Sequence, residues 1–228
     1  MSPLTANART TSIRIPIGQE IFLDADLSIP RETGGLVLFA HGSGSGRHST
    51  RNRAVAARLN TLHMATLLAD LLTADEERVD IRTAALRFDI PMLTRRVVQL
   101  IDWARSEPRL EKLPCGLFGA STGAAAALDA AAARPEATAA VVSRGGRPDL
   151  ASHIEFVRAP TLLIVGGDDT EVLEMNREAL RRMTAPSHLE VVPGATHLFE
   201  EPGALETVAS VAGEWFERYL FAPAGGAA

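Results

Sequence analysis

A serine flanked by glycines supplies the strongest chemical signal in the sequence. Gly119, Ser121 and Gly123 form a G-x-S-x-G motif between the apolar run CGLF and an alanine-rich segment. At a strand-to-helix junction, this motif makes a sharp elbow that projects the serine hydroxyl above the edge of a sheet. Small residues two positions either side of the serine avoid collision with the neighbouring strand and helix. The pattern predicts that Ser121 is a nucleophile, and an ordinary turn of small residues is the alternative.

A serine nucleophile needs a histidine base that a carboxylate orients. Among six histidines, His197 stands in the loop PGATHLFEEPG after the last predicted strand, which favours it as the base. His48 lies in a glycine-rich loop and stays a candidate substrate contact. The carboxylate is expected after the preceding parallel strand, where LLIVGGDDT offers two aspartates. The G-x-x-D spacing favours Asp169, and Asp168 is the alternative.

Backbone N–H groups are predicted to stabilise the oxyanion that forms when a serine attacks a carbonyl. One donor is the N–H of Thr122, which directly follows the nucleophile. The second is the N–H of Ser43, in the glycine-rich loop 41–46 after the third predicted strand. This loop has G-x-G-x-G spacing, which differs from the dinucleotide-binding G-x-G-x-x-G, and the chain lacks a G-K-[ST] phosphate loop. Nucleotide binding is therefore disfavoured.

Two arginines are candidate substrate-binding residues. Arg47 precedes the helix after the glycine-rich loop, and Arg144 ends the sixth predicted strand. Ligands of parallel α/β sheets meet the carboxyl ends of the strands, so both arginines could face a carboxylate or phosphate. Salt bridges within the protein are the alternative. No Cys/His cluster has metal-ligand spacing, so neither a metal nor a cofactor is expected.

Short apolar runs alternate along the chain with longer segments of helical period. The predicted strands begin at Ser12, Ile21, Gly35, Ala65, Pro114, Ala137, Pro160 and His188. The predicted helices begin near Thr50, Asp89, Thr122, Asp149, Glu171 and Ala204. The first two strands carry polar residues, whereas the later ones are almost wholly apolar, as in a parallel sheet covered on both faces. This pattern predicts an α/β fold with about eight strands, mostly parallel.

Composition and charge limit the compartment and the partners. We expect one domain over residues 1–228, with flexible ends at 1–11 and 222–228. The net charge of −5 lacks the basic face that nucleic acids or anionic membranes require. Cys115 is the only cysteine, is expected to be inert packing, and excludes an intrachain disulfide. With no signal-peptide core and no long apolar run, a cytoplasmic location is expected, and the oligomeric state is left open.

Four segments together resemble the dienelactone hydrolase-like branch of the α/β-hydrolase superfamily: HGSGSGRHSTRNR, GLFGASTGAAAAL, LLIVGGDD and GATHLFEEPG. The likeness spans roughly residues 21–220, and the order serine, aspartate, histidine is that of this fold. It implies the α/β-hydrolase fold and the same roles for Ser121, Asp169, His197, Ser43 and Thr122. Dienelactone hydrolases proper use cysteine where this chain has serine, so a general esterase or lactonase is expected.

The expected activity is hydrolysis of a carboxylic ester or lactone of a small substrate through an acyl-enzyme. An acyltransferase, or a non-catalytic ligand-binding or regulatory protein on the same fold, is the alternative. Only about fifteen residues separate the sixth and seventh predicted strands, too few for a cap domain. The site is therefore expected to be open, with specificity set by short loops such as Thr73–Arg87.

Overall fold

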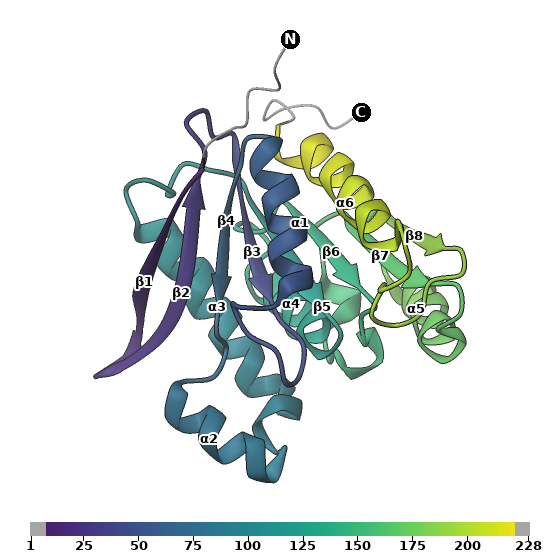
Figure 1. The fold of residues 1–228 in the computed structure, drawn as a ribbon, viewed down its shortest axis with the longest axis horizontal. Coiled ribbons are helices and arrows are strands. Elements are labelled where there is room, and N and C mark those ends of the chain that lie inside the picture. The colour runs from purple at the N-terminus through teal and green to yellow at the C-terminus, as the bar shows by residue number, and fades with distance from the viewer. Residues whose placement is uncertain (1–7, 222–228) are drawn as a thin grey trace.

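A computed structural model describes residues 8–221 and arranges their strands in one sheet (Figure 1). The strand order is β1-β2-β4-β3-β5-β6-β7-β8. β2 is antiparallel to β1 and β4, and all other neighbours are parallel. The strands are β1 Arg9–Gly18, β2 Ile21–Ile29, β3 Gly35–Ala40, β4 Met64–Ala69, β5 Cys115–Ala120, β6 Ala140–Arg144, β7 Thr161–Gly166 and β8 Ser187–Val192. The predicted fold class is confirmed.

Helices cover both faces of this sheet. In Figure 1, α1 and α6 lie in front of the strands, and α3 and α4 lie behind them. α2 stands apart at the carboxyl ends of the parallel strands, at the bottom of the same view. The helices are α1 Thr50–Thr61, α2 Ala74–Thr83, α3 Ile90–Ser106, α4 Thr122–Ala133, α5 Thr170–Arg182 and α6 Ala204–Leu220.

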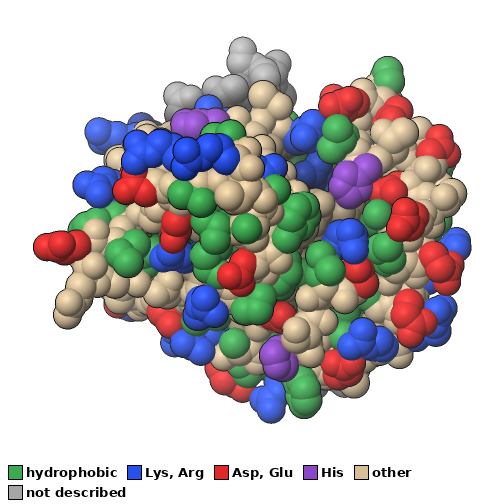
Figure 2. Space-filling view, turned by 90° about the horizontal axis from the view of Figure 1, so that it is seen from below, with side chains coloured by type: hydrophobic (Ala, Val, Ile, Leu, Met, Phe, Trp, Pro, Cys, Tyr) green, Lys and Arg blue, Asp and Glu red, His purple; other side chains and the backbone are tan. Residues whose placement is uncertain are grey.

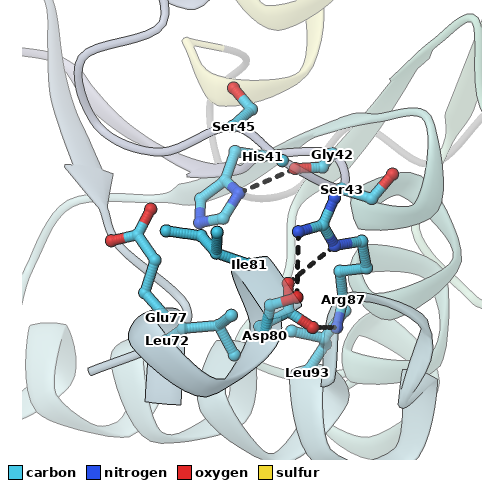
Figure 3. Close-up of a pocket in the computed structure, with 11 residues that line it drawn as sticks. His41, Gly42, Ser43, Ser45, Leu72, Glu77, Asp80, Ile81, Arg87 and Leu93 are labelled. Carbon is cyan, nitrogen blue, oxygen red and sulfur yellow. Dashed lines mark hydrogen bonds and ion pairs between the residues drawn. The ribbon is translucent and has the colours of Figure 1, made fainter. Parts of the chain in front are cut away.

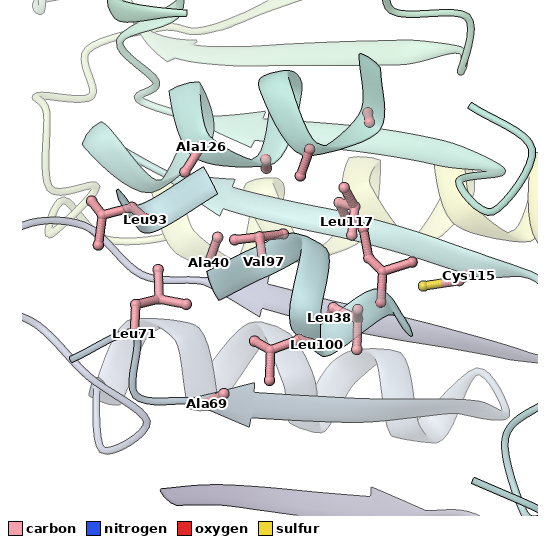
Figure 4. Close-up of a cluster of buried hydrophobic side chains, with 14 of the residues drawn as sticks. Leu38, Ala40, Ala69, Leu71, Leu93, Val97, Leu100, Cys115, Leu117 and Ala126 are labelled. Carbon is pink, nitrogen blue, oxygen red and sulfur yellow. The ribbon is translucent and has the colours of Figure 1, made fainter. Parts of the chain in front are cut away.

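Two apolar layers hold the helices to the sheet. The strands β3 to β7 are buried at every position, as expected when helices cover both faces. On the α3 and α4 side, Leu38, Val97 and Leu117 belong to one buried cluster (Figure 4). On the α1 and α6 side, Phe118 and Phe216 belong to a second cluster. The central strands therefore cannot shift without disturbing both layers.

Three expectations about local structure were wrong. The helix predicted near Asp149 is replaced by two short 3-10 helices, η2 Pro148–Leu150 and η3 Ile154–Phe156. Residues 73–87, expected to be a short loop, contain α2 and the 3-10 helix η1 Leu86–Phe88. Residues 9–11, expected to be flexible, belong to β1. Of the expected flexible ends, residues 1–7 and 222–228 lie outside the described residues.

The helix α2 begins at a capping box formed by Thr73 and Glu76, a motif that can be recognised in the sequence. The Thr73 hydroxyl accepts from the Glu76 N–H at 3.2 Å, and the Glu76 carboxylate accepts from the Thr73 N–H at 2.8 Å. This T-x-x-E pattern satisfies two backbone donors that would otherwise lack a helical partner. The apolar residues of α2 do not form the buried stripe that predicts a helix, because Val79 and Ile81 are exposed and do not pack against the sheet.

The connection between β6 and β7 is short, as expected. Residues 145–160 hold η2 and η3, and Asp129 of α4 fixes them by accepting the N–H groups of Ser152 and His153 at 3.0 and 2.8 Å. This segment therefore has no cap domain. Within residues 8–221, none of the helices combines the length and apolar character needed to cross a bilayer.

The single cysteine offers a probe of global unfolding. Cys115 is 6 % exposed, and burial raises the pKa of its thiol to about 12. Because the thiolate is the reactive form, we expect no reaction with a disulfide reagent at pH 8 in the native protein. Full reaction is expected in urea, along the same transition as the circular dichroism signal. Rapid labelling of the native protein would contradict the described packing.

Candidate active site

Ser121 occupies a strained turn between β5 and α4. Its backbone angles are φ 51° and ψ −123°, a conformation that a non-glycine residue rarely adopts. A Cβ at Gly119 would lie 2.4 Å from the Ala124 Cα, and one at Gly123 would lie 2.3 Å from the Ala40 oxygen. Both distances are too short for any side chain, so the glycines are what permits this turn. The Ser121 N–H donates to the Arg144 carbonyl at 3.2 Å, which ties the elbow to β6.

His197 and Asp169 are hydrogen-bonded at the neighbouring strand ends. The His197 Nδ1 lies 2.7 Å from the Asp169 Oδ2. Asp169 caps the start of α5, three residues after the end of β7, and its carboxylate is mostly buried. Asp168, the alternative from the sequence, is exposed, and its N–H donates to the Ala195 carbonyl. The bond to Asp169 fixes the proton on Nδ1 and leaves Nε2 to face a reacting group.

The loop that carries His197 is anchored by Phe199. Phe199 is buried in the α1 and α6 layer and has a φ of 55°, so the backbone turns sharply two residues after the histidine. Within the described residues 8–221, no hydrogen bond joins Ser121 to His197. Such bonds are often long without substrate and tighten when a substrate is bound. The His197 ring nevertheless lies over the end of β6, about 3.5 Å from where a Gly145 Cβ would be.

The two residues predicted to donate to the oxyanion, Ser43 and Thr122, are in contact with each other at the elbow. Thr122 is the first residue of α4, so its N–H belongs to the helical turn that lacks intrahelical partners. The Ser43 N–H donates to the Thr122 hydroxyl at 3.0 Å. A Cβ at Gly42 would lie 3.0 Å from the Ser121 Cβ, so the glycine-rich loop packs directly against the elbow. The bond between Ser43 and the Thr122 side chain was not predictable from the spacing.

His41 holds the glycine-rich loop in place, a role that the sequence analysis missed. Its Nε2 accepts the Leu71 N–H at 2.9 Å, and its Nδ1 lies 3.0 Å from the Gly42 carbonyl. These partners require a proton on Nδ1 and none on Nε2, so the ring is neutral. Burial lowers the pKa of His41, although the Gly42 carbonyl and Asp70 act in the opposite direction. The position of His41 directly after β3, at the start of the glycine-rich loop, was the sequence feature that could have indicated this role.

A cavity of about 340 Å³ opens beside the glycine-rich loop (Figure 3). Leu72, Ile81 and Leu93 give it apolar walls, and α2 forms one side. Arg87 also lines it, but the Arg87 Nε donates to the buried Asp80 carboxylate at 2.6 Å. The cavity can therefore receive a small, mostly apolar group next to the predicted oxyanion donors.

Arg47 lies among carboxylates. Its guanidinium contacts Asp70 and lies 3.8 Å from Asp24 and 3.9 Å from Asp26. The Arg47 backbone N–H also donates to Asp70, at 2.7 Å. His48, the other candidate contact in this segment, is exposed and accepts from Arg53 at 2.8 Å. These contacts favour the salt-bridge interpretation of Arg47 over a role in substrate binding.

Arg144, unlike Arg47, is not surrounded by carboxylates of the described residues. It ends β6 and is 8 % exposed, and it has no salt bridge within residues 8–221. Burial and the nearby Arg51 lower the pKa of Arg144 to about 10, so the side chain stays cationic at neutral pH. Its polar neighbour is Asn52, whose Oδ1 lies 3.5 Å from Nη2. Arg51 was not singled out from the sequence.

The neutral state of His41 predicts a loss of stability in acid. A histidine whose folded pKa is lowered binds a proton more readily when unfolded, so its contribution is complete above about pH 6.5 and is lost as the pH falls. The free energy of unfolding should fall by up to about 1.4 kcal/mol per pH unit below that value.

Urea unfolding at pH 7.5, 6.5 and 5.5 measures this slope. Gln can accept the Leu71 N–H without titrating, so His41→Gln should reduce the slope, whereas His188→Gln, at an exposed histidine, should keep it. An identical slope in wild type and His41→Gln would refute the assignment.

Solved structures and curated proteins resemble this chain over most of its length. It is 53 % identical to a dienelactone hydrolase from Anabaena variabilis, with a TM-score of 0.92, over 93 % of this chain and 99 % of that one. Est1E from Butyrivibrio proteoclasticus is 18 % identical over 91 % of this chain and 98 % of that one, with a TM-score of 0.76, which is a likeness of fold alone.

Curated proteins from two strains of Mycobacterium tuberculosis, each named "Putative phosphoribosyl transferase", are 54 % identical over 198 residues. This match covers 86 % of the chain but 44 % of those proteins, so the chain spans less than half their length. The model of the dienelactone hydrolase family matches residues 35–220. The chain therefore belongs to the dienelactone hydrolase family, as the resemblance of its motifs predicted.

Proposed function

We propose that this protein is a serine hydrolase that cleaves a carboxylic ester or lactone of a small substrate through an acyl-enzyme. The observation that carries this proposal is the His197–Asp169 hydrogen bond of 2.7 Å beside a serine held at φ 51°. Membership of the dienelactone hydrolase family supports hydrolytic chemistry. Serine in place of the cysteine typical of dienelactone hydrolases proper favours simple esters or lactones over dienelactone.

In the first step, the Ser121 oxygen attacks the substrate carbonyl carbon and its proton passes to the His197 Nε2. Asp169 accepts a hydrogen bond from the His197 Nδ1–H throughout, which keeps the ring in the productive tautomer and stabilises its charged form. The C–O bond to the alcohol then breaks, and His197 returns the proton to the departing oxygen. The products of this half-reaction are the free alcohol and an ester of Ser121.

The negative charge on the carbonyl oxygen is stabilised by the N–H groups of Thr122 and Ser43. In the resting protein the Ser43 N–H is held by the Thr122 hydroxyl, so an oxyanion must share or replace this bond. The hydroxyl thereby keeps the Ser43 amide directed toward the elbow until a substrate arrives. His41 supports the same loop from behind.

In the second half-reaction, a water molecule gives a proton to His197 and attacks the acyl-enzyme. The Ser121–acyl bond breaks, the serine recovers its proton, and the carboxylic acid leaves. The cavity of about 340 Å³ beside the glycine-rich loop is suited to the acyl part, because it adjoins Ser43 and has apolar walls. Its size favours short acyl groups over long lipid chains.

The transferase name of the Mycobacterium tuberculosis relatives does not argue against this assignment. This chain covers 44 % of those proteins, and the activity in their name can belong to the part that it does not match. The chain also lacks the G-x-G-x-x-G and G-K-[ST] spacings of phosphate-binding loops. We assign ester chemistry to the matched part, with acyl transfer to an alcohol as the variant in which an alcohol replaces water.

A fluorophosphonate tests the nucleophile directly. Wild-type protein should gain the mass of one adduct, and peptide mapping should place it on Ser121. Turnover of short p-nitrophenyl esters should disappear in Ser121→Ala and persist in Ser152→Ala, which changes an exposed serine outside the site. Labelling of a different residue, or turnover that survives in Ser121→Ala, would reject the proposed nucleophile.

The two adjacent aspartates allow a matched test of the carboxylate. Asp169→Asn should lower kcat by about three to four orders of magnitude, because an amide cannot hold the imidazole in the productive tautomer. Asp168→Asn removes the same charge one residue away and should change kcat less than about threefold. Single-turnover kinetics on a p-nitrophenyl ester gives both values. Equal effects of the two substitutions would contradict the assignment of Asp169.

A further inference from the structure

A buried cation without a counter-ion stands beside the proposed nucleophile. Arg144 is 8 % exposed, and its Nε has no hydrogen-bond partner within residues 8–221. The contact of its Nη2 with the Asn52 oxygen, at 3.5 Å, is longer than an ordinary hydrogen bond. Burying a charge is costly unless it is paired, so this side chain is expected to have a partner that the protein does not supply.

Arg51 adds a second positive charge near Arg144. It lies on α1 one residue before Asn52, and its partner Glu200 directly follows Phe199, whose ring centre lies 5.9 Å from the Arg144 guanidinium. The Arg51 Nε is also buried without a partner, although its Nη1 lies 3.2 Å from the exposed Glu200. The Arg144 and Arg51 guanidinium groups thus each keep an unused Nε donor, and a bound anion is the type of group that accepts from such donors.

Other arginines near the carboxyl ends of the parallel strands contact a carboxylate of the protein. Arg47 contacts Asp70, Arg87 donates to Asp80, and Arg147 makes two bonds to Asp149 at 2.8 and 2.7 Å. The protein therefore neutralises its arginines in this region wherever a carboxylate is within reach. Arg144 is the exception among these residues, because no carboxylate of residues 8–221 pairs with it, whereas the neighbouring Arg51 pairs with Glu200.

The pair lies on the histidine side of the nucleophile. The Arg144 guanidinium lies 5.9 Å from the centre of the Phe199 ring, and Phe199 follows His197 by two residues. The Arg144 carbonyl accepts the Ser121 N–H. Because His197 must return its proton to the departing alcohol, the alcohol part of an ester lies on this side. Figure 2, which views the carboxyl ends of the parallel strands, shows Lys and Arg side chains in a hollow beside a histidine.

We propose that Arg144 and Arg51 form an anion subsite for a carboxylate or phosphate carried by the alcohol part of the substrate. This inference rests on the proposed ester hydrolysis and names its substrate class as esters of anionic alcohols. The planar forks of two arginines suit the paired oxygens of either group. The cavity under α2 then takes the acyl part, on the opposite side of the elbow.

Three acetyl esters with related leaving groups test the subsite. They are 4-acetoxybenzoate, 4-acetoxyphenyl phosphate and the neutral methyl 4-acetoxybenzoate. Arg144→Gln should lower kcat/KM at least tenfold for an anionic ester and less than threefold for the neutral one. Comparing each variant with wild type on the same ester removes intrinsic differences in leaving-group reactivity. A larger loss with the carboxylate or with the phosphate identifies which anion the subsite prefers.

Matched variants separate local recognition from general electrostatics. Arg158→Gln removes an exposed arginine that pairs with Glu136, and it should leave all three rates unchanged. Arg144→Lys should recover part of the anionic rate, since it restores the charge without the planar fork. Arg51→Gln should reproduce the selective loss, and it carries the test if Arg144→Gln does not fold. Equal loss on neutral and anionic esters would mean a structural role and overturn the subsite.

A binding experiment keeps the inference separate from the proposed hydrolysis. The product alcohols 4-hydroxybenzoate and 4-hydroxyphenyl phosphate are titrated calorimetrically into Ser121→Ala protein. At least one should bind, with affinity reduced tenfold or more when Arg144→Gln is added and unchanged when Arg158→Gln is added. Binding without ester turnover would reject the proposed function and retain the anion subsite. Absence of binding by both alcohols, or binding that Arg144→Gln leaves intact, would overturn the subsite.

Discussion

Ser121 holds its backbone at φ 51° between a fully buried strand and a helix that is buried from Thr122 to Ala131, and the rest of the site is arranged around this turn. The strain is sustained because Gly119 and Gly123 let α4 and the end of β3 approach where no Cβ would fit. Buried layers on both faces of the sheet keep β5 from relaxing. Once the turn is fixed, the ends of β3, β6 and β7 are the places from which other groups can reach the serine.

Electrostatics at this edge of the sheet is divided between the two sides of the elbow. On the side of β2 and β4, Asp24, Asp26 and Asp70 surround Arg47, so carboxylates of the protein itself compensate its positive charge. On the side of β6, Arg144 has no carboxylate partner within residues 8–221, and Arg51 has a single one, the exposed Glu200. The protein thus presents apolar walls on one side of the serine and unsatisfied positive charge on the other. A substrate with an apolar end and an anionic end would be oriented by this difference.

The elbow, the eight strands and the pairing partner of His197 were accessible from the sequence because each depends on local spacing. The helix α2 was missed because its apolar residues Val79 and Ile81 are exposed and do not pack against the sheet, although the Thr73 and Glu76 capping pair can be read in the sequence. The helix expected near Asp149 failed because Pro148 and a sixteen-residue connection allow only short 3-10 turns. The surroundings of Arg47 and Arg144 depend on residues that are distant in the chain, so spacing could not distinguish a paired from an unpaired arginine.

Phe199 connects two parts of the site that are usually treated separately. Its buried ring anchors the loop of His197, and the same ring lies beneath the Arg144 guanidinium. An anion that draws Arg144 toward itself would therefore act on the wall that positions the imidazole. Binding of the anionic end of a substrate would then help to align the His197 ring, in addition to increasing the affinity. In such an arrangement, discrimination between substrates is expressed in the rate of acylation, because binding energy from a remote group is used at the reacting centre.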